Sequence, residues 1–202
     1  NDSGTVARAY DFNGNKTSFD YDSLNRLTLI DPADSQWLNT SIRYEADSSG
    51  VGVLLQNITQ GAYRKTVTLN ALMQPVLTKE WDNNQEAQTV RYVRAEFNAY
   101  GKTVFSSVPS ASATETFGSS TAFDGLQRPV SQSNTASGDL NFGYGANNSI
   151  TVTNGKNYST TTQYLAYGSP AFEHAILISQ PEGVSTSISY NVANLPVSIT
   201  QG

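Results

Sequence analysis

Residues 21–28, with the sequence YDSLNRLT, decide the fold. The aromatic ring of Tyr21 suits the pleated, half-buried surface of a β-strand. The carboxylate of Asp22 can accept hydrogen bonds from nearby backbone N–H groups and thereby open a turn. Asn25 tolerates the positive φ that tight hairpin turns demand. The stretch therefore predicts a strand, a tight turn and a second strand.

The same five-residue pattern recurs in seven segments that align without gaps. They begin at Tyr10, Tyr21, Leu69, Phe97, Phe123, Tyr164 and Tyr190. The first position is aromatic in six of the seven, the second is Asp or Asn in six, and the fifth is Gly or Asn in five. The anchor residues of the repeat are Tyr10, Asp11, Gly14, Tyr21, Asp22, Asn25, Phe97, Asn98, Gly101, Phe123, Asp124, Tyr164, Gly168, Tyr190, Asn191 and Asn194. We predict one hairpin turn at each segment.

The residues around these turns favour strands as well. Four of the seven prolines lie two positions after the fifth residue of a segment, namely Pro75, Pro129, Pro170 and Pro196. Proline cannot donate to a strand ladder, so we expect each at a strand start or along an unpaired edge. Apolar and polar residues alternate in residues 188–192 and 195–199, which is the period of a half-buried strand. The pair Asn154-Gly155 is a further hairpin signal.

The spacing of the segments predicts a repetitive all-β fold. With two weaker candidates at Tyr44 and Tyr144, most successive anchors lie about 20–28 residues apart. One hairpin fits that length, and because it cannot bury its apolar face alone, neighbouring hairpins must lie edge to edge. We therefore expect residues 1–202 to form a single array of antiparallel hairpins in one long, twisted and curved sheet. The best helix candidate, residues 87–97, has at its centre Thr89-Val90-Arg91-Tyr92-Val93, which favours a strand.

Composition indicates a folded but thin protein. Hydrophobic residues make up 38% and charged residues 14% of the chain, and the net charge is -5. Disordered chains of low hydrophobicity usually carry high net charge and few aromatic residues, whereas this chain has 11 Tyr, 8 Phe and 2 Trp. Its basic residues are scattered, which argues against a nucleic-acid partner. Cysteine is absent, and no apolar run approaches the roughly 20 residues of a membrane span.

Candidate catalytic groups are few, and their ordinary structural roles explain them. His174 is the single histidine, and a triad would need a nucleophile and an orienting acid within reach. The carboxylates Glu80, Asp82 and Glu86 cluster, as paired acids do in glycosidases, but they fall at a predicted turn. Possible oxygen ligands for calcium are Asp31, Asp34, Asp47, Asp82 and Asp139, none of them in an EF-hand spacing. We expect no enzyme activity, no metal and no cofactor.

Exposed aromatic residues leave one binding alternative open. Rings on a β surface can stack against sugars, and Trp37 and Trp81 are the weak candidates for glycan stacking. The competing interpretation places these rings in the hydrophobic layer between neighbouring hairpins, and we favour it. An exported carbohydrate-binding or adhesin module therefore remains the alternative function.

The segments Tyr10-Asp11-x-x-Gly14 and Tyr21-Asp22-x-x-Asn25-Arg26-Leu27 resemble the YD repeat of the RHS (rearrangement-hotspot) family. Relatives of that family include insecticidal toxin complexes and teneurins. The second segment departs from the family pattern only in Asn25, where the family has Gly, while the other copies drift further. The resemblance extends from Tyr10 to Thr200.

The resemblance implies a role as well as a fold. YD repeats build a spiralling β-sheet that closes into a hollow shell around an effector, and any enzyme lies outside the repeats. We therefore expect a secreted or cell-surface bacterial segment of shell wall, an excerpt of a longer chain and too short to enclose a large cavity. Its expected partners are neighbouring repeats of the same or another chain, paired through sheet edges, and an enclosed effector polypeptide.

Overall fold

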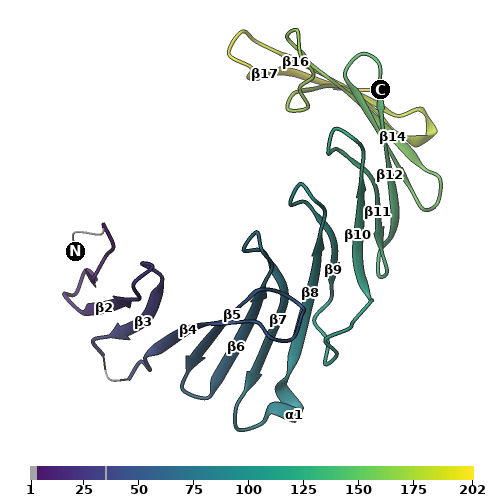
Figure 1. The fold of residues 1–202 in the computed structure, drawn as a ribbon. Helices are drawn as coiled ribbons and strands as arrows, with labels where there is room; N and C mark the ends of the chain where they lie inside the picture. The colour runs from purple at the N-terminus through teal and green to yellow at the C-terminus, as the bar shows by residue number, and fades with distance from the viewer. Residues whose placement is uncertain (1–3, 35) are drawn as a thin grey trace. The chain divides into compact units, whose positions relative to one another are not determined.

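The computed structural model describes residues 4–34 and 36–202, and these form two compact units. The first unit extends to Phe117 and the second comprises Gly118–Gly202. In Figure 1 the first unit is coloured purple to teal and the second green to yellow. Each unit is described by itself below.

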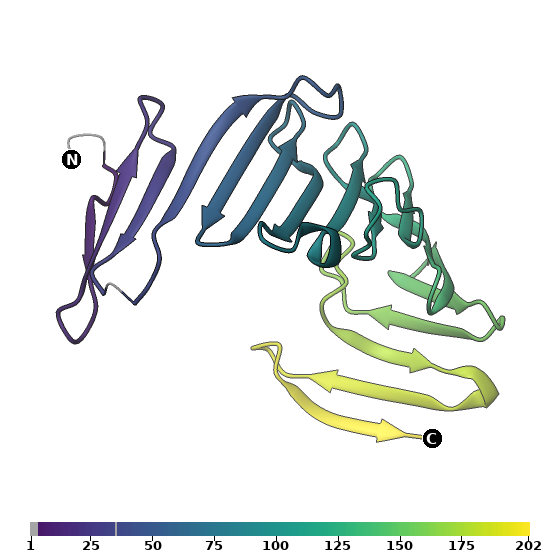
Figure 2. The ribbon, with the colours of Figure 1, turned by 90° about the horizontal axis from the view of Figure 1, so that it is seen from below.

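The first unit consists of strands and one short helix. Its elements are β1 (Arg8–Tyr10), β2 (Lys16–Tyr21), β3 (Leu27–Pro32), β4 (Thr40–Ala46), β5 (Leu54–Gln60), β6 (Tyr63–Leu69), β7 (Pro75–Asp82), α1 (Glu86–Thr89), β8 (Arg91–Phe97) and β9 (Thr103–Ser107). Within the described residues each strand pairs antiparallel with the next one along the chain, from β1 through β9. Figure 2 shows these hairpins lying side by side in one layer.

The second unit repeats this arrangement. Its elements are β10 (Gly118–Phe123), β11 (Pro129–Asn134), β12 (Gly138–Gly145), β13 (Ser149–Asn154), β14 (Ser159–Tyr164), β15 (Ala175–Ser179), the 3-10 turn η1 (Pro181–Gly183), β16 (Ser185–Tyr190) and β17 (Pro196–Gln201). Successive strands again pair antiparallel, from β10 through β17. The expected all-β fold of sequential antiparallel hairpins is thus confirmed.

The prolines and the helix candidate test the local predictions. Pro75, Pro129 and Pro196 are the first residues of β7, β11 and β17, as expected, whereas Pro170 lies in a loop.

The strand predicted around Thr89 is right only from Arg91 onward. Thr89 ends α1 instead, because its hydroxyl donates to the Gln85 carbonyl at 2.8 Å and its backbone N–H donates to the same oxygen at 3.1 Å.

Neither unit has a deep hydrophobic core. Among the described residues, Val67 is the one buried hydrophobic side chain, at 8% exposure, and no side chain falls below 2%. A single-layer sheet leaves both of its faces in contact with water, so most apolar residues are only half-buried. This confirms the thin layer that composition predicts. Stability must come from the ladders, the turns and contacts between adjacent strands.

Contacts between hydroxyl side chains on neighbouring strands recur in the second unit. Thr151 and Thr161 are 2.8 Å apart, Thr153 and Ser159 are 2.8 Å apart, and the Ser189–Ser198 oxygens are 2.7 Å apart. Pairs of this kind contribute about 0.2–1 kcal/mol each. Part of the high Ser and Thr content is therefore explained by hydrogen bonds between neighbouring strands.

The last strand departs from the prediction of a half-buried strand. Val197 and Ile199 are 62% and 68% exposed, although Ile199 pairs with Ile188 of β16. Within the described residues β17 pairs on one side only, with β16. The alternating pattern was identified correctly, but burial of its apolar face would need a neighbour on the free edge.

Gly52 offers a direct test of packing in the first unit. A Cβ atom at Gly52 would lie 2.5 Å from the Leu69 carbonyl oxygen and 2.7 Å from Cγ2 of Thr68. We expect Gly52→Ala to lower the free energy of unfolding by about 1–3 kcal/mol in urea titrations. The matched control is Gly125→Ala, where no heavy atom lies within 4 Å, and a change within about 1 kcal/mol is expected. Equal losses for both variants would contradict this packing.

Candidate functional site

One turn geometry recurs at the second position of the repeat. The Asp22 side chain accepts hydrogen bonds from the backbone N–H groups of Leu24 and Arg26, both at 2.9 Å. The Asn25 N–H donates to the Asp22 carbonyl at 3.0 Å, and the Asp22 N–H donates to the Arg26 carbonyl at 2.9 Å. These four bonds define a three-residue hairpin loop with a bulge. We call this arrangement the Asx turn.

Within residues 4–34 and 36–202 the Asx turn is repeated at six other places. The residues that occupy the position of Asp22 are Asp11, Asn70, Asn98, Asp124, Asn154 and Asn191. Asn154 is a copy that the sequence pattern missed, because Thr153 stands where the other segments carry an aromatic residue or Leu69. The hairpin signalled by Asn154-Gly155 is confirmed, because β13 pairs antiparallel with β14, and the positive φ of 63° falls on Asn157.

The fifth position has positive φ in every predicted segment. Gly14, Asn25, Gly101, Gly168 and Asn194 have φ between 57° and 82°. Met73 and Gln127 adopt φ of 60° as well, although neither residue type favours this region. The Asx hydrogen bonds therefore impose the conformation even where the fifth side chain opposes it.

Met73 provides a test of this imposed strain. Met73→Gly should raise the free energy of unfolding by about 0.5–1 kcal/mol, because glycine adopts positive φ without a Cβ clash. The control Leu72→Gly alters the neighbouring turn residue, which is 64% exposed and does not have positive φ, and should lower stability. Thermal unfolding of both variants gives the comparison. A destabilised Met73→Gly would show that the turn is not strained.

Two Asx turns carry a clamp to a neighbouring strand. The Arg26 guanidinium lies 2.7 Å from the Asp22 carboxylate and 4.2 Å from the centre of the Tyr44 ring in β4. Backbone and side-chain hydrogen bonds from Arg26 lower the pKa of the Asp22 carboxyl. The cation on an aromatic face joins the turn of one hairpin to the first strand of the next.

The second unit contains the same clamp. Arg128 lies 2.7 Å from Asp124 and 4.1 Å from the centre of the Tyr144 ring in β12. The backbone hydrogen bond from Arg128 is the largest influence that lowers the pKa of the Asp124 carboxyl. The rings of Tyr44 and Tyr144, the two weaker repeat candidates, thus each contact the arginine of the preceding Asx turn.

Tyrosine hydroxyls bind backbone carbonyls at or just before the start of the preceding strand. Tyr21 donates to the Val6 carbonyl at 3.0 Å, Tyr144 donates to Pro129 at 2.9 Å, and Tyr190 donates to Ala175 at 2.9 Å. Each acceptor stands 15 residues earlier in the chain. The phenol therefore explains why tyrosine is useful at this register, beyond its apolar ring.

Glu80 is the centre of a charged cluster that crosses three strands. It accepts from Lys65 of β6 at 3.0 Å, from the Arg91 Nε of β8 at 2.9 Å and from the Tyr63 hydroxyl at 3.1 Å. Hydrogen bonds from Lys65 and Arg91 lower the pKa of Glu80 from its ordinary value of 4.5 to about 2. The cluster therefore supports the ladder and leaves Glu80 ionised.

Acid should weaken the first unit through Glu80. Because the pKa of Glu80 is lower in the folded state, its contribution is complete above about pH 4.5 and is lost as the pH falls toward about 2. Glu80→Gln should therefore be less stable at neutral pH and lose less stability over that range. Denaturant titrations at several pH values measure this, with Glu173→Gln as the control, and identical pH slopes for Glu80→Gln and the parent chain would contradict it.

The segment at Tyr164 does not form an Asx turn. Its second position is Leu165, which has no side-chain acceptor, and the Leu165 N–H donates to the His174 carbonyl at 2.8 Å. Gly168 keeps the predicted positive φ, but residues 165–174 form a longer loop between β14 and β15. The tight turn predicted for this copy is therefore wrong, although β14 and β15 still pair as an antiparallel hairpin.

Asn148 holds this loop against the sheet. Its Nδ2 donates to the Tyr164 carbonyl at 3.2 Å and also to the Ala171 carbonyl. Its Oδ1 accepts the Ala171 N–H at 3.2 Å. The Phe172 ring packs edge-on against Tyr164 at 5.6 Å and is tilted against Tyr144 at 6.1 Å. These contacts hold the loop beside Tyr144 of β12 and Tyr164 of β14.

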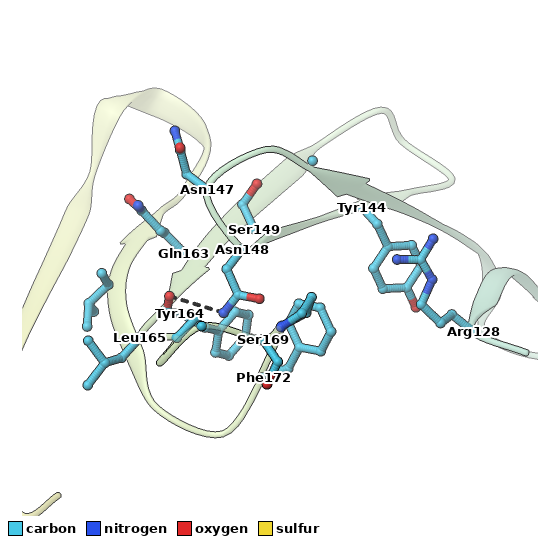
Figure 3. Close-up of a pocket in the computed structure, with 15 residues that line it drawn as sticks. Arg128, Tyr144, Asn147, Asn148, Ser149, Gln163, Tyr164, Leu165, Ser169 and Phe172 are labelled. Atoms are coloured by element: carbon cyan, nitrogen blue, oxygen red, sulfur yellow. Dashed lines mark hydrogen bonds between the residues drawn. The ribbon is translucent and has the colours of Figure 1, made fainter. Parts of the chain in front are cut away.

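A hollow of about 600 Å³ results from this loop. Figure 3 places Asn147, Ser149 and Gln163 on one side of the hollow and Tyr144 with Arg128 on the other. The lining therefore combines aromatic rings with amides and hydroxyls, drawn from residues far apart in sequence.

The other candidate residues lie outside this hollow. His174 packs edge-on against Tyr190 at 5.2 Å, and no hydrogen bond in the described chain joins its ring to Ser169 or Ser179. Of the carboxylates, Glu86 pairs with Lys79 at 2.6 Å, and Asp82 accepts the Asn84 N–H. The described residues contain no group of three His, Cys, Asp or Glu placed to hold a metal.

The two tryptophans have different surroundings. Trp37 lies in the loop between β3 and β4 and is 64% exposed. Trp81 lies in β7, where the Lys79 ammonium stands 4.3 Å from the centre of its ring. No ring contact joins the two indoles in the described part of the chain, so they do not form a common platform.

Comparisons with known proteins do not assign a family. No protein-family model matches the sequence, and no curated protein matches it. A solved structure described as a porin-like protein from Bacteroides uniformis ATCC 8492 matches at 12% identity, over 93% of this chain and 81% of that chain, with a TM-score of 0.27. A score this low carries no argument about fold or function. Within the described residues, none of the helices has the length and apolar character needed to span a membrane.

Proposed function

We propose that this chain is a non-catalytic structural segment of an exported bacterial protein of the YD/RHS type, part of the wall of a shell that encloses or presents a toxin or effector. The observation that carries the proposal is the recurrence of one Asx turn at seven places in sequentially paired hairpins. A chain that repeats one hairpin and has almost no buried core is suited to lateral extension.

The exposed apolar side chains of β17 support the same role. Strands β3, β7 and β11 each follow an Asx turn and pair on their far side with β4, β8 and β12. β17 also follows an Asx turn, but it pairs with β16 alone in the described chain. Its exposed Leu195, Val197 and Ile199 suit a further strand of the same kind, from this protein or from another copy.

Removal of the last hairpin tests the structural role. If residues 185–202 are deleted, amide hydrogen exchange should rise in β15 and return to parent values within a few strands of the second unit, because each hairpin contacts only its neighbours. Cooperative loss of protection throughout β10–β15 would contradict the array. Turnover of a glycan or peptide substrate by the intact chain would contradict a non-catalytic role.

A test of the shell requires the full protein isolated from its native source. Electron cryomicroscopy should show the strands of this chain continued by flanking strands around a separate polypeptide. A free-standing sheet with no enclosed polypeptide would contradict the shell and leave the hairpin array intact.

A further inference from the structure

The hollow beside residues 165–174 is lined by polar side chains that have no hydrogen-bond partner among the described residues. Among the described residues, the side chains of Asn147, Gln163 and Ser169 make no hydrogen bond within the chain, although all three line the hollow. An amide side chain offers two donors and one acceptor oxygen, and a serine hydroxyl both donates and accepts. The hollow thus presents mixed donors and acceptors without a fixed partner.

The charge of the lining points to a neutral ligand. Arg128 is the one charged side chain among the lining residues, and its guanidinium is already bound to Asp124 at 2.7 Å while it covers the Tyr144 ring. An anionic ligand would have to compete with that carboxylate. A cationic ligand would meet Arg128 with no acid among the lining residues to balance it.

The aromatic part of the lining adds an apolar contact surface. Phe172 remains 36% exposed at the hollow while its ring packs against Tyr164 and Tyr144. Ligand sites of this size, about 300–1,000 Å³, characteristically combine apolar and aromatic walls with a few polar groups that fix orientation. A molecule with hydroxyls around a weakly polar C–H face satisfies both kinds of wall.

We infer that this hollow is a binding site for a short neutral saccharide. The free amides of Asn147 and Gln163 and the hydroxyl of Ser169 bind sugar hydroxyls, and Phe172 contacts the C–H face of a ring. Neither Trp37 nor Trp81 is among the residues that line the hollow, and the site adds a ligand to the structural role proposed above.

Binding of defined oligosaccharides tests the site in the intact chain. The probes are cellotriose, maltotriose and chitotriose, with trigalacturonate as the anionic comparison, measured by saturation-transfer NMR and calorimetry. At least one neutral probe should bind, and Gln163→Ala should weaken binding about tenfold, as expected for loss of one hydrogen-bonding group that the ligand covers. Asn147→Gly should act similarly while keeping a residue that tolerates the positive φ of 58° at this position.

Controls separate the site from folding and from other surfaces. Asn141→Ala removes an exposed amide of β12 outside the hollow and should leave affinity unchanged, as should Trp37→Ala. Circular dichroism establishes that each variant is folded, and Ser169→Ala is the substitute should Gln163→Ala unfold. Absence of binding by every neutral probe at millimolar concentration would overturn the assignment. Tighter binding of trigalacturonate, or loss of binding in Trp37→Ala but not in Gln163→Ala, would overturn it equally.

Discussion

The structure depends on one short-range interaction, in which an Asp or Asn side chain accepts two backbone N–H groups of its own turn. At Asp124 these are the N–H groups of Leu126 and Arg128, both at 2.9 Å. The bonds satisfy turn amides that no ladder could reach, and they bring the following strand back beside the preceding one. Because each Asx turn is closed locally, the hairpin that it joins begins with its register already set, and long-range contacts are not needed to choose it.

Lateral contacts then replace the core that a thicker protein would have. The arginine four residues after Asp22 or Asp124 contacts the tyrosine of a neighbouring hairpin, and tyrosine hydroxyls bind backbone carbonyls at or just before the start of the preceding strand. Individual pairs of these kinds are weak, on the order of 1 kcal/mol or less. They are repeated along the chain, however, and so a sheet with hardly any buried side chain can be stabilised by its neighbours.

The hairpins could be predicted from the sequence because their determinants are local. The hollow could not be predicted, because it depends on contacts between residues far apart in the chain. An aromatic residue followed by Asx marks the turns at Asp11, Asp22, Asn98, Asp124 and Asn191, all confirmed. Asn154 escaped the pattern because the residue before it plays no part in the turn bonds. The Tyr164 segment resembled a turn by its tyrosine and glycine, yet Leu165 lacks the oxygen that closes one. The hollow depends on Asn148 holding Ala171, a contact between residues 23 positions apart that no local pattern encodes.

Amide hydrogen exchange by NMR measures the Asx turns most directly. The account predicts that amides at the fourth and sixth positions, such as Leu126 and Arg128, exchange slowly, whereas Tyr167 and Ser169 in the Tyr164 segment, which lacks the acceptor, exchange rapidly. Rapid exchange at all of these positions alike would contradict the claim that the Asx side chains close the hairpins.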